Sequence, residues 1–68
     1  MIRVYLFDRI ITRGSSSYEY DQYAEVYQKW RPIYGDRVEL NTDHSDHFQI
    51  WLNFDTEEEA VLFKLTHL

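Results

Sequence analysis

Hydrophobic and polar side chains alternate along three segments of the chain, residues 1–7, 37–43 and 47–54. This period of two is typical of β-strands that bury one face. In the first segment the expected core positions are Ile2, Val4 and Leu6. The alternation fails between Asp8 and Gly14, where we predict a bulge or a loop.

The second and third segments are expected to form one hairpin. Paired residues must point to the same face of the sheet, so Leu40 should lie opposite Ile50 and Val38 opposite Leu52. The same register places Asp43 opposite His47 and leaves residues 44–46 as a three-residue loop.

Between the first and second of these segments, the apolar residues recur with the period of an α-helix. Ser16 and Glu19 form a capping box ahead of a segment whose aromatic residues fall on one arc. Pro32 and Gly35 predict that this helix ends between residues 29 and 34. The arc contains Tyr20, Tyr23, Ala24, Tyr27, Trp30 and Tyr34.

A second capping box, Thr56 with Glu59, begins a helix that runs to the end of the chain. Its apolar residues occupy two sides, and both sides cannot face one sheet. Ala60 and Phe63 lie on one side, whereas the other holds Val61, Leu62, Leu65 and Leu68.

The sequence therefore predicts a single small α+β domain over residues 1–68, with the order β-α-β-β-α and both helices on one face of a three-stranded sheet. A right-handed crossover should make the first strand parallel to whichever hairpin strand it joins. The element order resembles a ferredoxin-like domain that lacks its last strand. Strand order within the sheet is left open.

Composition and net charge disfavour several classes of function. The net charge of −5 disfavours unspecific attraction to nucleic acid or to anionic membranes. The chain has no cysteine, which fits a reducing cytoplasm and removes thiol nucleophiles and thiolate zinc sites. No apolar segment is long enough for a membrane span, and the two glycines form no phosphate-binding loop. We expect a cytoplasmic protein without a cofactor.

Aromatic residues make up 18% of the chain, and strand parity predicts where three of them lie. If the even positions of the first strand face the helices, then Tyr5, Phe7 and Trp51 face outward, with Arg3 and Arg37 at the rim. Exposed aromatics on an open sheet suggest a recognition surface. Residues 10–14 or a second copy could instead cover them.

The outward aromatics also resemble the base-stacking positions of the RNA recognition motif, with Tyr5 and Trp51 as the matching residues. That family's glycine and aromatic signature is absent from residues 48–54, a fourth strand is missing, and the net charge has the wrong sign. Nucleic-acid binding therefore stays an alternative.

Two clusters could carry chemistry. Asp43, His44, Asp46 and His47 are residue types that bind zinc, nickel or copper, but the spacing favours a polar turn. Ser15, Ser16 and Ser17 lack the base and glycine-rich elbow of a catalytic nucleophile. We predict no metal site and no enzyme.

These observations favour a non-enzymatic module that binds another protein, or itself as a homodimer, through the aromatic sheet face. Phe63 is a second candidate contact. The small, acidic, cysteine-free chain is typical of phage-encoded accessory proteins and inhibitors of host factors. Single-stranded nucleic-acid binding on the sheet face and acidic mimicry of nucleic acid are the alternatives.

Overall fold

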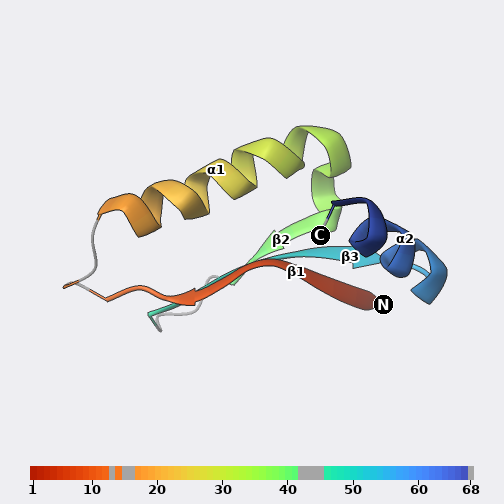
Figure 1. Ribbon diagram of the computed structural model, residues 1–68, viewed down its shortest axis with the longest axis horizontal. Helices are drawn as coiled ribbons and strands as arrows, with labels where there is room; N and C mark the ends of the chain where they lie inside the picture. Colours follow the sequence, from red (N-terminus) through yellow and green to blue (C-terminus); the bar gives the residue numbers. More distant parts are fainter. Residues whose placement is uncertain (13, 15–16, 42–45, 68) are drawn as a thin grey trace.

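The computed structural model describes residues 1–12, 14, 17–41 and 46–67, and these form a small α+β domain. The predicted order of strands and helices is confirmed. Both helices lie on the same side of a three-stranded antiparallel sheet (Figure 1). The elements are β1 (Ile2–Ile10), α1 (Ser17–Tyr34), the short 3-10 helix η1 (Gly35–Arg37), β2 (Val38–Leu40), β3 (His47–Phe54) and α2 (Glu57–His67).

The sheet has the order β1-β3-β2, so β3 is the central strand. The predicted hairpin register is confirmed, because Val38 pairs with Leu52 and Leu40 pairs with Ile50. The expectation of a parallel neighbour for β1 is wrong. β1 pairs antiparallel with β3, and β2 lies on the far side of β3.

A β-bulge in β1 changes which of its side chains reach the core. Tyr5 pairs with Trp51 but Phe7 pairs with Ile50, so Leu6 is the extra residue. Inserting one residue reverses the alternation beyond it. Phe7 therefore faces the helices and is 8% exposed, whereas the sequence pattern placed it on the outer face. The strand also continues through Ile10, past the predicted break.

The core lies between the sheet and the two helices. α1 contributes Trp30, and α2 contributes Ala60 and Phe63. Of the predicted arc of α1, Trp30 is buried and Tyr23, Tyr27 and Tyr34 are half-buried, whereas Tyr20 and Ala24 are exposed. The sheet contributes Val4, Phe7, Val38, Ile50, Leu52 and Phe54, and Ile11 completes the buried cluster.

Local signals set the ends of the helices. Gly35 adopts a left-handed backbone (φ +58°), which only glycine takes without strain, and it ends α1 after Pro32 has been accommodated in the last turn. The Thr56 hydroxyl accepts a hydrogen bond from the Glu59 amide at 3.3 Å, as its capping box predicts. Ser16 lies outside the described residues.

Tyr23 makes the stability of the fold sensitive to alkaline pH. Burial against Phe7 and Phe48 raises the pKa of Tyr23 above its ordinary value of 10.0, and the neighbouring Tyr27 adds to the effect. Its contribution to stability is therefore complete below the pKa of the unfolded chain and is lost as pH rises through the folded-state pKa.

We expect wild-type protein to lose stability more steeply than Tyr23→Phe between about pH 9 and about pH 11. Urea unfolding at a series of pH values measures this. Tyr20→Phe is the matched control, because Tyr20 also packs on Phe48 but is 42% exposed. Identical slopes for Tyr23→Phe and wild type would contradict the assignment.

Candidate functional site

Trp51 lies on the outer face of the sheet, as strand parity predicts, but its indole is not open to solvent. It pairs across the sheet with Tyr5 on one side and Glu39 on the other. The Arg3 guanidinium sits 4.6 Å from the ring centroid, and the Tyr5 ring meets it edge-on at 6.0 Å. These neighbours leave Trp51 only 9% exposed. The expectation of an uncovered indole is wrong.

The indole is also held by a hydrogen bond. Its Nε1–H donates to a Glu39 carboxylate oxygen at 3.1 Å. A buried Trp N–H ordinarily finds such a partner, and the bond fixes the ring against the sheet. Trp51 thus stabilises the outer face of the domain within a single chain.

Of the residues predicted to bind a partner, three are accessible. Tyr5 is 45% exposed, and Arg3 is exposed although it covers Trp51. Arg37 is exposed too, but it makes ion pairs with Asp55 at 3.7 Å and with Glu59 at 3.8 Å. It therefore links η1 to the start of α2. Arg3 and Tyr5 both lie against Trp51, whereas Arg37 is engaged with Asp55 and Glu59, so the three side chains do not form the predicted recognition surface.

Phe63, like Phe7, is a predicted partner contact that the structure places in the core. It is 4% exposed and its ring packs against Trp30, Tyr34 and Phe54, with centroid separations of 5.3, 5.9 and 5.4 Å. Phe63 belongs to the face of α2 that covers the sheet, so the expectation that it contacts a partner is wrong.

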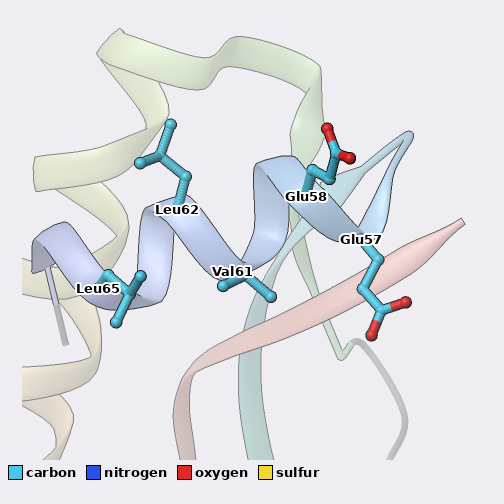
Figure 2. Close-up of a pocket in the computed structure, with 5 residues that line it drawn as sticks. All are labelled: Glu57, Glu58, Val61, Leu62 and Leu65. Atoms are coloured by element: carbon cyan, nitrogen blue, oxygen red, sulfur yellow. The ribbon is translucent and has the colours of Figure 1, made fainter.

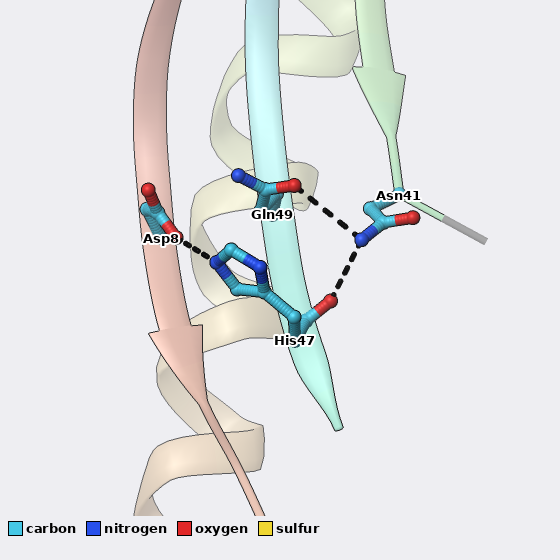
Figure 3. A network of polar contacts seen from close by, with 4 residues as sticks. All are labelled: Asp8, Asn41, His47 and Gln49. Carbon is cyan, nitrogen blue, oxygen red and sulfur yellow. Dashed lines mark hydrogen bonds and ion pairs between the residues drawn. The ribbon is translucent and has the colours of Figure 1, made fainter. Parts of the chain in front are cut away.

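The other end of the sheet face carries a polar network, shown in Figure 3. His47 Nε2 is paired with an Asp8 carboxylate oxygen, and the Asn41 amide donates to the His47 carbonyl at 3.0 Å and to Gln49 Oε1 at 3.4 Å. The imidazole thus pairs with an acidic residue of β1. Its predicted hairpin partner, Asp43, lies outside the described residues.

The sequence offers four candidate metal ligands at the hairpin end, two of which the structure describes. Asp43 and His44 lie outside the described residues, while Asp46 is exposed directly before β3. Within the part of the chain that the structure describes, no three His, Asp or Glu side chains are grouped closely enough to hold a metal ion. Among the described side chains at this end of the hairpin, Asn41 is hydrogen-bonded to Gln49, and His47 is paired with Asp8 of β1.

The largest exposed apolar feature of α2 is a row formed by Val61, Leu62 and Leu65, which we call the α2 apolar row. Their exposures are 46%, 65% and 81%. Together with Glu57 and Glu58 they line a shallow pocket on the outer side of the helix (Figure 2). The sequence indicated that one of two apolar sides had to stay outside, and the structure identifies it as this one.

An open strand edge lies next to the α2 apolar row. Because β3 is central, β1 has a strand neighbour on one side only among the residues that the structure describes. α2 packs over the N-terminal half of β1 (Figure 1), and Val61 and Glu57 point to the side of the helix along which β1 runs (Figure 2). Unpaired N–H and C=O groups and exposed apolar side chains therefore occur together on this flank.

Comparison of the chain with protein-family models, with curated proteins and with solved structures gave no match. Among the described residues, neither helix combines the length and apolar character that a membrane crossing requires.

Proposed function

We propose that this chain is a non-enzymatic protein-binding module whose binding surface is the α2 apolar row with the adjoining edge of β1. The observation that carries the proposal is the exposure of Val61, Leu62 and Leu65 side by side on a helix whose other face is fully used in the core. A chain of this size gains nothing in stability from three exposed aliphatic residues, whereas contiguous apolar patches mark interaction sites.

The location differs from the aromatic sheet face that strand parity favours. Phe7 and Trp51 are unavailable for a partner because they are buried within the chain. Tyr5 and Arg3 remain accessible at the N-terminal half of β1, so they could extend the contact from the edge of β1 onto the sheet face. We therefore assign them a secondary role in binding.

The two alternatives have weaker support. Base stacking on the sheet face would need free rings, but Arg3 and Glu39 already hold Trp51, and the carboxylates of Glu39 and Asp8 repel a phosphate backbone. Mimicry of nucleic acid would need a continuous acidic surface. Arg37 interrupts it by pairing with Asp55 and Glu59.

Catalysis is not part of the proposal. The His47–Asp8 pair is half-exposed on the sheet face, with 41% and 47% side-chain exposure. Water screens an ion pair at such a site, and catalysis usually depends on preorganised charge in a water-excluded site. The pair is better explained as a cross-strand contact that holds β1 to β3.

The finer features expected from the sequence are proposals of the same kind. The order β1-β3-β2 is compatible with a ferredoxin-like arrangement without its last strand, since a strand following α2 would reach the free edge of β1 first. The absence of cysteine fits work in the cytoplasm. A role as a small phage-type accessory protein or inhibitor of a host factor agrees with the acidic composition.

Site-specific photocrosslinking tests the proposed surface. A photoreactive amino acid at position 65 should give protein adducts in the cells that express the chain, and mass spectrometry would identify them. The matched control is position 33, because Ile33 is 65% exposed in the last turn of α1. Equal labelling from both positions, or adducts only from position 5 on the sheet face, would remove α2 as the binding surface.

A further inference from the structure

We propose that the partner of the α2 apolar row is a second copy of this chain, with the two α2 helices antiparallel across a two-fold axis near Val61. This inference rests on the proposed binding surface and adds the identity and geometry of its occupant. A two-fold interface must be complementary to itself, so the charges and shape of α2 decide whether the proposal is possible.

The charges on α2 are complementary when the helix is reversed. Glu57 and Glu58 lie in its first turn, and Lys64 lies in its last turn. A two-fold axis near Val61 brings Glu57 of one copy about level with Lys64 of the other, because the two positions lie on opposite sides of Val61 along the helix, one turn away in each direction. The same pair forms twice in the dimer. A parallel arrangement would instead oppose the two acidic ends.

The helical period keeps these charges beside the apolar row. Positions 57 and 64 are two turns apart and project along the same flank of the helix. Leu65 lies in line with Val61 one turn further on, and Leu62 lies on the opposite flank. The interface thus has apolar side chains at its centre and charged groups at its margin, as in a specific protein–protein contact.

Helix pairing alone is too small for a stable dimer. An α-helix of 11 residues is about 16 Å long, whereas a standard interface covers about 800 Å² on each partner. The edge of β1 supplies the missing contact, because it lies on the same flank of α2 as Val61. A two-fold axis perpendicular to the sheet would make the two β1 strands antiparallel, together with the α2 helices that pack over them.

The β1 contact uses the regular part of the strand. Residues Ile2–Tyr5 precede the bulge and keep straight pairing with β3. With Val4 opposite Val4 of the second copy, Arg3 lies opposite Tyr5, and the paired stretch ends before the bulged residue Leu6. Opposed residues then face the same side of the sheet, and like charges are not set against each other. The two sheets would join into one of six strands.

Sedimentation equilibrium over about 1 μM to about 1 mM tests the dimer. The mass of wild-type protein should rise from 8.4 kDa toward twice that value. Leu65→Glu should raise the dissociation constant at least about 30-fold, because each dimer contains the substitution twice. Ile33→Glu is the control: it also adds a carboxylate in the last turn of a helix, where the helix dipole opposes it equally, and it should leave the dissociation constant unchanged.

A charge exchange tests the antiparallel geometry. Glu57→Lys and Lys64→Glu should each weaken the dimer about 3-fold to 10-fold, and the double variant should recover most of the loss. Both substitutions oppose the dipole of α2, so their effects on thermal stability should add and cannot produce the recovery. Absence of recovery would overturn the proposed helix pairing.

Two further results would overturn the proposal while separating it from the proposed function. Wild-type protein that stays at 8.4 kDa up to about 1 mM cannot pair with itself, even if crosslinking at position 65 captures a different protein. In that case the surface stands and its occupant is wrong. A dimer that Leu65→Glu does not weaken would show that the two copies meet elsewhere.

Discussion

Replacement of Phe63 by alanine is expected to leave most of the protein unfolded at 25 °C. The ring of Phe63, on α2, packs against α1 through Trp30 and Tyr34 and against the sheet through Phe54. Removing a buried phenylalanine costs about 3 to 5 kcal/mol. A core of this size rarely supplies more than about 3 to 5 kcal/mol in total. The expected loss is therefore as large as the whole free energy of unfolding.

Circular dichroism and urea unfolding measure this effect. Phe63→Leu should retain a folded population, because it keeps part of the apolar volume. Ile33→Ala is the control, since Ile33 is 65% exposed, lies in a helix outside the proposed binding surface, and alanine is at least as good a helix former. A cooperative unfolding transition of Phe63→Ala with nearly the wild-type midpoint would mean that Phe63 is not in the core.

The second large effect is expected for Trp51→Ala, which should lower the free energy of unfolding by about 3 kcal/mol. The substitution removes an indole that is 9% exposed, together with its contacts to Arg3 and Tyr5. It also leaves the Glu39 carboxylate without the hydrogen bond from Nε1. The estimate is at the lower end of the range for Trp because neighbouring side chains on an outer face can close over the gap.

Trp51→Phe separates packing from hydrogen bonding. It keeps an aromatic ring beneath Arg3 but cannot donate to Glu39, so it should cost about 1 kcal/mol. Chemical denaturation of both variants measures the difference. If Trp51→Ala folded with wild-type stability, the indole would be dispensable for the fold, and the sheet face would again be the better candidate for binding.

This result bears on how binding should be tested. An open indole would make Trp51→Ala a test of binding, but the contacts of Trp51 with Arg3, Tyr5 and Glu39 make the substitution a test of stability. Variants of the α2 apolar row do not have this drawback. Leu62 and Leu65 make most of their surface available to solvent, so polar replacements there leave the core intact.

Local patterns were sufficient for the elements and for the hairpin. The pairing of Val38 with Leu52 and of Leu40 with Ile50 followed from the requirement that paired residues share a face. The Thr56 cap and the left-handed Gly35 followed from short-range backbone chemistry. In each case the deciding interaction spans a few residues, or two strands joined by one short loop.

Tertiary structure decided the exposure of the aromatic residues. The bulge at Leu6 turns Phe7 inward, and nothing in an alternating pattern shows where an extra residue will be accommodated. Trp51 kept its predicted face but is covered by Arg3 and Tyr5, which come from a strand far away in sequence. Burial is a property of neighbours, and those neighbours were known only once β1 had been placed beside β3.

Helix α2, which has apolar residues on two sides, shows the same difference between what the sequence determines and what the tertiary structure decides. The sequence by itself determined that α2 has more apolar surface than one sheet can cover. Only the tertiary structure decided that Ala60 and Phe63 face the core and that Val61, Leu62 and Leu65 remain outside. The physical reason is that the rotation of a helix about its axis is fixed by what it packs against, here the Trp30, Tyr34 and Phe54 rings, and not by its own periodicity.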